Sequence, residues 1–443
     1  MPRFSFAALA ACSLAALPLG AASTPAPVTA PATTPATAPA TTAPPVVSHD
    51  EGPLPQLGEE RAAEVTEIDV SGAARALFKV AVVAAQGTDD AMSADVMSRD
   101  FQLSSLVEVL DPRSFKGDVA GETTRIDDRS WREVGAEYVV KTQVEATRVT
   151  FRLFAVSRSR DAVLTKAYDV SKESMRSVTH QFCNEVIKWL TGTPGSFGGR
   201  LVFSSRTEKG KRGIFVIDAD GSGLGRLPAP QDVAQAPAFG PGGVYYSGSQ
   251  TNGSFAIFKV GVPAPVFEQT GLALGVAFFG KRLAAVVASG GRADVFKGEL
   301  GAKEPQRVTQ GGLSTHPAFS SDGRLAWASD VGGTQQIYVE GKRVTWRGKE
   351  NMAPTWCGTP QGMRILFMGR EGGVWDVFSI DPDGGSLQRL TQGQGSNKYP
   401  ACSPDGRMIA FFSSRGGLFM ANPQGLNQQI VAKVEGESLR WEP

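Results

Sequence analysis

One short motif recurs through the second half of the chain. It ends in an aromatic residue or a cysteine, and in four of its copies the second residue is proline. The six copies begin at Ala236, Gly275, His316, Ala353, Tyr399 and Ser438, with steps of roughly 37 to 46 residues between them. A period of this length is typical of the blade of a β-propeller, in which each blade is a four-stranded sheet. Six copies therefore predict six blades.

Each repeat follows one strand plan. A short first strand ends in a turn such as 321–323, which reads Ser-Asp-Gly, and a hydrophobic second strand such as 408–412 follows. Asp-Gly suits turns that need positive φ. A third strand such as 213–218 runs into another glycine turn, and a fourth strand ends in Arg-Leu, Arg-Val or a similar pair. The repeat that begins at Gly275 departs from the plan, because Phe279-Gly280-Lys281-Arg282 replaces its Asp-Gly turn.

The first and last strands of the repeat region are complementary. Almost nothing follows the last copy of the motif, whereas the strands at 200–227 have no first strand before them. We therefore expect residues 439–441 to become the innermost strand of the blade that begins at Arg200 and to pair with 201–204. Such pairing closes a propeller ring and removes its open edge.

The segment at 51–195 predicts a small α/β domain, ahead of a propeller at 198–443. The expected elements are a strand at 78–84, a helix at 91–106, strands at 137–144, 148–156 and 162–170, and a closing helix. In that helix apolar residues recur at three- and four-residue steps, at Met175, Val178, Phe182, Val186 and Trp189. Gly192 stands where a C-cap glycine belongs.

The N-terminal residues predict export. Residues 1–22 have the positive charge, apolar run and small residues of a signal peptide, with the mature chain starting near Ser23. A rival interpretation takes Leu9-Ala10-Ala11-Cys12 as a lipoprotein box with a lipidated Cys12. Residues 23–50 form a Pro/Ala/Thr-rich tether that cannot bury a core and favours an extended conformation.

Composition excludes several classes of partner. Charged residues make up 20% of the chain and the formal net charge is +1, so no basic surface is available for nucleic acid or anionic lipid. No stretch of the mature chain approaches the ~20 apolar residues of a membrane span. We expect a protein that is peripheral to membranes.

Catalytic and metal-binding motifs are not found. The sequence has no Gly-x-Ser-x-Gly elbow, no phosphate-binding glycine loop and no Cys or His pair at metal-ligand spacing, so we expect no enzyme activity, no metal and no cofactor. His180 falls on the polar side of the closing helix, which favours a solvated surface residue. The acidic segments 218–221 and 381–384 favour turns over calcium loops.

Three cysteines remain after the leader. Cys357 and Cys402 occupy nearly matching places in successive repeats, so a disulfide is possible in an oxidising compartment. Buried free thiols are the favoured interpretation for these two and for Cys183.

The chain resembles the TolB family over nearly all of its mature length. The similar segments are 128–140 and 152–154 in the α/β domain, Arg176 and His180 by their spacing, and, most specifically, the junction at 190–203, which leads into the first blade. The resemblance implies a periplasmic adaptor whose propeller binds the peptidoglycan-associated lipoprotein Pal, with TolA contacting the N-terminal side. It also implies a role in outer-membrane integrity and in invagination during cell division. The tether departs from the family, in which the α/β domain begins close to the cleavage site.

Blade topology predicts the binding face. The connection from each fourth strand to the next first strand runs inward to the channel mouth, so the residues just before each first strand should ring it. They are Gln235, Leu274, Thr315, His316, Asn351, Met352, Lys398, Tyr399 and Glu437. A ring with Tyr, His and Met among polar groups has the character of a protein-binding surface. The alternatives are a propeller-gated hydrolase and a propeller that binds a small ligand or metal in its channel.

Overall fold

The computed structural model describes residues 77–443 apart from 85–90, 118, 120, 172, 208–210 and 303. The predicted signal peptide, lipoprotein box and tether lie outside these residues. Among the described residues, no helix combines the length and apolar character needed to cross a membrane.

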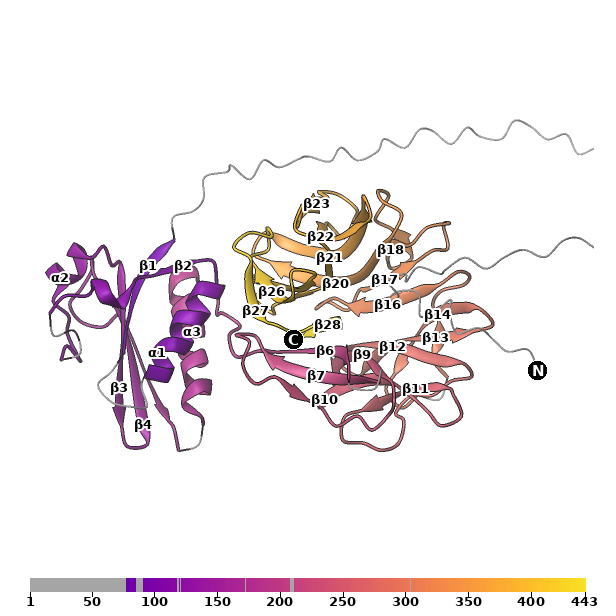
Figure 1. Cartoon of the computed structure of the whole chain (residues 1–443), viewed down its shortest axis with the longest axis horizontal. Helices are drawn as coiled ribbons and strands as arrows, with labels where there is room; N and C mark the ends of the chain where they lie inside the picture. Colours follow the sequence, from indigo (N-terminus) through magenta and orange to yellow (C-terminus); the bar gives the residue numbers. More distant parts are fainter. Residues whose placement is uncertain are drawn as a thin grey trace, which may run out of the picture. The chain divides into compact units, whose positions relative to one another are not determined.

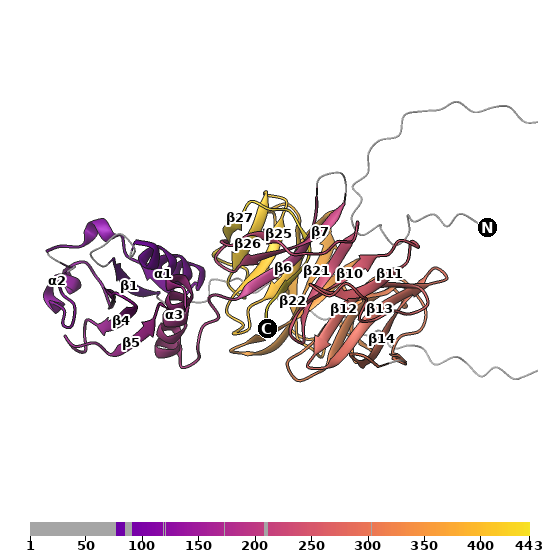
Figure 2. The same cartoon turned by 90° about the horizontal axis from the view of Figure 1, so that it is seen from below.

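The α/β segment consists of one sheet and two main helices (Figure 1). Its sheet has the order β2-β1-β3-β4-β5, with β1 parallel to both neighbours and β3, β4 and β5 antiparallel. The elements are β1 (Phe78–Val83), α1 (Ala91–Leu103), β2 (Val107–Val109), η1 (Pro112–Ser114), α2 (Asp128–Glu133), β3 (Tyr138–Glu145), β4 (Arg148–Ala155), β5 (Leu164–Asp169) and α3 (Met175–Thr191). Figure 2 shows α1 and α3 beside each other on one face of this sheet. The predicted strands and helices are confirmed, and β2, η1 and α2 are additional.

Helix α3 has the start and stop signals that its sequence indicates. The Ser174 side chain accepts a hydrogen bond from the backbone N–H of Ser177, as an N-cap does. Gly192 ends the helix with φ 87°, and its N–H donates to the carbonyl of Lys188. Only glycine adopts this left-handed conformation at little cost, so the predicted C-cap is confirmed.

The rest of the chain is a β-propeller. Four of its sheets contain four strands each and one contains seven. One four-stranded sheet contains β16 (Ser314–Phe319), β17 (Leu325–Ser329), β18 (Gln336–Val339) and β19 (Lys342–Arg343), and a second contains β20 (Asn351–Thr359), β21 (Gly362–Glu371), β22 (Val374–Ile380) and β23 (Gln388–Arg389). A third contains β24 (Asn397–Cys402), β25 (Ile409–Ser413), β26 (Gly417–Ala421) and β27 (Gln429–Ala432). The fourth contains β28 (Glu437–Trp441), β6 (Arg200–Arg206), β7 (Arg212–Asp218) and β8 (Gly225–Arg226).

The seven-stranded sheet combines two repeats. Its strands are β9 (Ala234–Gly240), β10 (Gly243–Ser249), β11 (Phe255–Lys259), β12 (Leu272–Phe279), β13 (Arg282–Ser289), β14 (Arg292–Glu299) and β15 (Gln306–Arg307). A single parallel pair, Phe255 with Leu272, joins the two halves. The four-strand plan is wrong for the first half, where only an isolated bridge between Ile257 and Phe267 replaces the fourth strand. Pro263 and Pro265 lack the N–H that a ladder needs there.

The innermost strand of every repeat contains a register shift. In five of the six strands a residue with positive φ lies at the shift; these residues are Ala236, His316, Ala353, Tyr399 and Ser438, with φ between 47° and 55°. A left-handed residue inserted into a strand makes a bulge, which bends the strand and redirects its side chains. The recurring motif therefore marks the bulge of each inner strand.

The last strand pairs with the first strand of the propeller region. β28 runs antiparallel to β6, with Trp441 opposite Leu201 and Arg440 opposite Val202, as the sequence predicts. Figure 1 shows β28 beside β6. Leu439 is fully buried, and Gly436, just before β28, leaves no room for a larger residue, because an added Cβ would lie 2.5 Å from ring carbons of Phe203 and Phe412.

A disulfide joins two inner strands. Cys357 of β20 is bonded to Cys402 of β24, with their Cα atoms 5.4 Å apart. The preference for free thiols at these positions was therefore wrong, because matching positions on adjacent inner strands bring the two side chains within bonding distance. Cys183 is a buried free thiol, as expected.

The pairing of β28 predicts that Trp441 is a stability determinant. Trp441→Ala should lower the free energy of unfolding by about 3 to 5 kcal/mol, since the indole is only 7% exposed. Trp346, which is 62% exposed, provides the matched control, and Trp346→Ala should change the stability by less than about 0.5 kcal/mol. Urea unfolding followed by circular dichroism gives both values, and equal effects would contradict the role of β28.

The disulfide predicts a redox-dependent stability. It closes a loop with a sequence separation of 45 residues, so reduction should cost about 2 to 4 kcal/mol. Denaturant midpoints with and without dithiothreitol measure this cost. The double variant Cys357→Ala/Cys402→Ala should be insensitive to the reductant, and a wild-type midpoint that dithiothreitol leaves unchanged would show that the bond adds nothing.

Candidate functional site

The predicted ring residues all lie on the inner strands. The structure places them within the first two or three residues of β9, β12, β16, β20, β24 and β28, one or two residues to a strand. The expectation that they precede these strands was therefore wrong by a few residues. The physical reason is the bulge, because pairing with the second strand begins before the motif and continues after the register shift.

Burial divides the ring into two groups. Asn351, Met352 and Tyr399 are buried, with exposed fractions of 3%, 6% and 5%. The half-buried members are Gln235, Leu274, Thr315, His316, Lys398 and Glu437. The Asn351 amide donates to Gln336 Oε1 of β18 at 2.8 Å and to the carbonyl of Arg347 at 2.7 Å, so it ties β20 to the preceding sheet. The half-buried group is the part of the ring that can meet a ligand.

His316 is neutral at physiological pH. Its Nδ1 lies 2.9 Å from the hydroxyl of Thr315. Burial, and secondly the positive charge of Arg440, lower the pKa of His316 to about 4. Glu437, on β28, has its charge balanced by an ion pair with Arg212.

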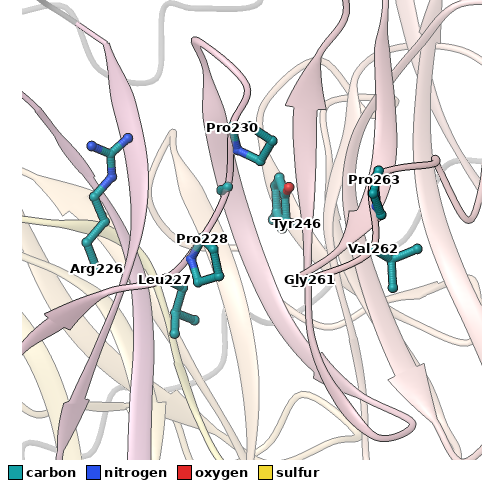
Figure 3. Close-up of a pocket in the computed structure, with 9 residues that line it drawn as sticks. Arg226, Leu227, Pro228, Pro230, Tyr246, Gly261, Val262 and Pro263 are labelled. Carbon is teal, nitrogen blue, oxygen red and sulfur yellow. The ribbon is translucent and has the colours of Figure 1, made fainter.

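A second surface feature is an apolar pocket of about 560 Å³ between β8 and β10. Its lining consists of Arg226, Leu227, Pro228, Ala229, Pro230, Tyr246, Gly261, Val262 and Pro263. In Figure 3 the two prolines at 228 and 230 lie on one side of Tyr246, and Val262 and Pro263 lie on the other. The Tyr246 hydroxyl donates to Gln231 at 2.7 Å. The lining is mostly apolar, with Arg226 and the hydroxyl of Tyr246 as its polar side-chain groups, so it can bind apolar groups.

The structure overturns the prediction for His180. Only 7% of its side chain is exposed, and its Nδ1 lies 2.7 Å from Asp100 Oδ2 of α1. Its Nε2 lies 3.8 Å from Asp220 Oδ2 in the turn after β7. Helix periodicity marks His180 as polar but does not show which polar residues find a buried partner. Its partners lie on α1 and in a propeller turn, far away in the sequence.

Arg176, Asp100, His180 and Asp220 form a buried polar network, with Cys183 beside it. Arg176 makes an ion pair with Asp220, and burial, opposed by the hydrogen bond with His180, raises the pKa of Asp100. Burial also raises the pKa of the Cys183 thiol, which is therefore not an activated nucleophile. The network joins α1 and α3 to the turn after β7, where the sequence predicts only a turn.

One ligand atom from each of Asp100, His180 and Asp220 lies within 4.8 Å of the others. Such a group has the donor types of a divalent metal site. Arg176, however, places its positive charge on the Asp220 carboxylate, and Asp100 engages a ring nitrogen of His180. The residues are therefore already satisfied by one another, which fits a structural ion-pair network better than a metal site.

The fold and site define a class of protein: a β-propeller with an α/β segment before it and a ring of mixed polar and apolar residues on its inner strands. A family model described as the TolB beta propeller domain matches residues 187–441, and one described as the TolB amino-terminal domain matches residues 66–162. The chain belongs to the TolB family.

Curated relatives agree with this assignment. The Tol-Pal system protein TolB of Syntrophotalea carbinolica is 33% identical over 158 residues, which cover 34% of this chain and 36% of that protein. The protein TolB homolog of Chlorobium chlorochromatii is 32% identical over 250 residues, 56% of this chain and 39% of that protein. The matched regions thus span well under two thirds of the length of these relatives.

A solved structure shows the same fold. The crystal structure of TolB from Acinetobacter baumannii superposes with a TM-score of 0.72 at 22% identity, covering 83% of this chain and 96% of that one.

The raised pKa of Asp100 predicts a pH-dependent stability. A carboxyl whose pKa is raised above its ordinary 3.8 on folding stabilises the fold at low pH and loses that contribution as the pH rises through the raised value. Asp100→Asn removes the titration and keeps an oxygen that can accept from His180. As the pH rises above about 4, the unfolding free energy of the wild type should fall relative to that of the variant.

The control for this prediction is Asp95→Asn, which changes an exposed carboxylate on the same helix. The difference in unfolding free energy between Asp95→Asn and the wild type should not change with pH in this way. A pH-independent difference between the wild type and Asp100→Asn would contradict the raised pKa.

Proposed function

We propose that the chain is the TolB component of a Tol-Pal system and that it acts as a periplasmic binding protein without catalytic activity. Its propeller mouth binds the lipoprotein Pal, and TolA contacts its N-terminal side. In this role it supports outer-membrane integrity and invagination during cell division. The observation that carries the proposal is membership of the TolB family together with the ring of half-buried residues on the inner strands.

The architecture we propose is a ring of six blades closed by β28. Three features support it: the six inner-strand bulges, the pairing of β28 with β6, and the contacts of each inner strand with the next, in the order β28, β9, β12, β16, β20 and β24 and back to β28. Residues 51–195 and 198–443 are the proposed α/β domain and propeller, preceded by the signal peptide at 1–22 and the tether at 23–50.

The proposed location is the periplasm of a Gram-negative bacterium, reached through a cleavable leader. The disulfide between Cys357 and Cys402 supports an oxidising compartment, because such bonds persist outside the reducing cytosol. Lipidation of Cys12 is the alternative outcome, and mass spectrometry of the mature N-terminus separates the two.

Binding to Pal provides the direct test. We expect His316→Ala to weaken binding of the soluble domain of Pal from the same genome by about 1 to 3 kcal/mol, without a change in melting temperature, because His316 is half-buried on β16. Lys398→Ala should act in the same direction. Isothermal titration calorimetry measures both affinities.

The matched control is Lys281→Ala. Lys281 is exposed and lies in the turn after β12, at the opposite end of that strand from Leu274. Its replacement should leave the affinity unchanged. Equal affinities for the wild type, His316→Ala and Lys398→Ala would place the partner on another surface, and no binding by the wild type would refute the proposed function.

A further inference from the structure

We infer that the disulfide between Cys357 and Cys402 is a redox switch for the junction between the propeller and the α/β segment. In the oxidised chain the bond fixes the turn at 403–407, which in turn fixes the linker at 192–199. Reduction releases the turn and loosens the linker, while the blades stay folded. The inference goes beyond the proposed function and does not depend on what the propeller binds.

The disulfide lies at the end of β24, directly before the turn. Five copies of the recurring motif end in an aromatic residue, whereas the copy in β24 ends in Cys402. Its bond to Cys357, near the end of β20, joins two neighbouring sheets covalently. The next residue, Ser403, begins the turn, and its N–H donates to the carbonyl of Met408 at 2.9 Å. A displacement of Cys402 therefore moves the turn.

The turn is also packed tightly against β20. Gly406 has φ 67°, and a Cβ added to it would lie 1.9 Å from the carbonyl oxygen of Gly358, the residue after Cys357. Within the turn, the Ser403 hydroxyl donates to Asp405 Oδ1 at 2.6 Å, and the N–H of Gly406 donates to the carbonyl of Ser403 at 2.9 Å. The turn is thus one hydrogen-bonded unit that the disulfide and this close approach position on β20.

The same turn contacts the α/β segment and its linker. Asp405 Oδ1 accepts a hydrogen bond from the Ser196 hydroxyl at 2.8 Å. Arg407 donates from Nη2 to the hydroxyl of Thr191 at 3.0 Å and also to that of Thr193. Thr191 is the last residue of α3. The turn is therefore bonded both to the end of this helix and to the linker that follows it.

The linker is itself fixed to α3. The Asn184 amide donates to the carbonyl of Phe197 at 3.1 Å and accepts from the N–H of Phe197 at 2.8 Å. The N–H of Gly195 donates to the backbone carbonyl of Asn184 at 3.3 Å. A shift of the turn therefore reaches α3 by two routes, through the linker and directly through Arg407.

A second turn of the same sequence type shows what distinguishes 403–407. Residues 320–324 read Ser-Ser-Asp-Gly-Arg, and residues 403–407 read Ser-Pro-Asp-Gly-Arg. Arg324 pairs with Asp322 of its own turn at 3.0 Å. Arg407, in contrast, donates to the α/β segment. The turn beside the disulfide is thus the one whose arginine connects the two parts of the chain.

Reduction requires a dithiol, such as the active site of a thiol–disulfide oxidoreductase. A thiolate of the reductant attacks Sγ of Cys402, the S–S bond breaks, and Cys357 leaves as a thiolate that takes up a proton. The second thiol of the reductant then attacks the mixed disulfide and frees Cys402, so the reductant becomes a disulfide and two electrons pass to the chain. We assign the attack to Cys402 because it is half-buried, whereas Cys357 is only 1% exposed.

The structural consequence of reduction is local. Two free thiols cannot keep the positions of two bonded sulfur atoms, because non-bonded atoms stay further apart. The close approach of Gly406 to Gly358 leaves no room for rearrangement, so the turn must move away from β20. The two sheets remain packed through apolar side chains, which include Leu366, Ile409 and Phe411. The blades therefore persist while the junction loosens.

Hydrogen exchange with mass spectrometry tests this inference on the whole mature chain. Within the first minutes, dithiothreitol should speed amide exchange in the linker at 192–199 and the turn at 403–407 by roughly fivefold or more. Strands β16 and β17, in another sheet, should stay protected over the same time. Alkylation with iodoacetamide shows by peptide mass that Cys357 and Cys402 have been reduced.

Three variants separate the steps. Cys357→Ser/Cys402→Ser should show the faster exchange without reductant. Arg407→Ala should loosen the linker while the disulfide is intact, because it removes the hydrogen bonds to the end of α3 and to the linker. Arg324→Ala, in the matching turn, is the control and should leave exchange in the linker unchanged.

Three outcomes would overturn the inference. The first is unchanged exchange in the linker of a chain in which both cysteines have been alkylated. The second is an equal increase in all peptides, which indicates a loss of global stability and no local release. The third is a folded chain that dithiothreitol does not reduce, because its disulfide cannot act as a switch. None of these outcomes bears on the binding of Pal, so the proposed function is tested separately.

Discussion

The antiparallel pairing of β28 with β6 is the interaction on which the propeller depends. It connects residues as far apart in the sequence as Ser204 and Glu437, whose hydroxyl and carbonyl share a hydrogen bond across a separation of 233 residues. Without it, β6 would lose its inner neighbour, and Leu439 and Trp441 would leave the cluster that contains Leu201 and Phe203. The other propeller sheets form from strands that follow one another along the chain, whereas this long-range pairing joins the start and the end of the propeller region.

Much of this architecture was predictable because strands and turns are encoded locally. A glycine turn with positive φ and a period-two hydrophobic strand leave their signals within a few residues, and the repeat supplies the same signal six times. The predictions that failed concern features that the local sequence does not encode. The burial of His180 depends on Asp100 and Asp220, which lie on other elements, and the disulfide of Cys357 depends on the next repeat. The start of each inner strand was misplaced because a bulge does not follow regular alternation.

The candidate site shows the same difference between features that the local sequence predicts and features that depend on distant contacts. The ring residues could be chosen from topology, but their roles could not. Asn351 and His316 occupy similar places, and only the structure shows that the Asn351 amide is satisfied by Gln336 of the preceding sheet and by the carbonyl of Arg347.

The alternating direction of the strands also separates the ring residues of the inner strands from the buried polar network around Asp100. Ring residues lie where inner strands begin, whereas the contacts of the α/β segment come from turns at the other ends of strands. Ser196 donates to Asp405 after β24, Arg176 pairs with Asp220 after β7, and Asn427 after β26 donates to Ser105 at 2.9 Å. β24 carries Lys398 at one end and leads to Asp405 at the other, and a six-residue strand spans about 20 Å. Direct electrostatic influence over that distance is weak at physiological ionic strength. Any coupling between a ligand at the ring and the buried network around Asp100 must therefore be transmitted by the strands themselves, through β28, β6 and β7, which pair in one sheet that leads to the turn with Asp220.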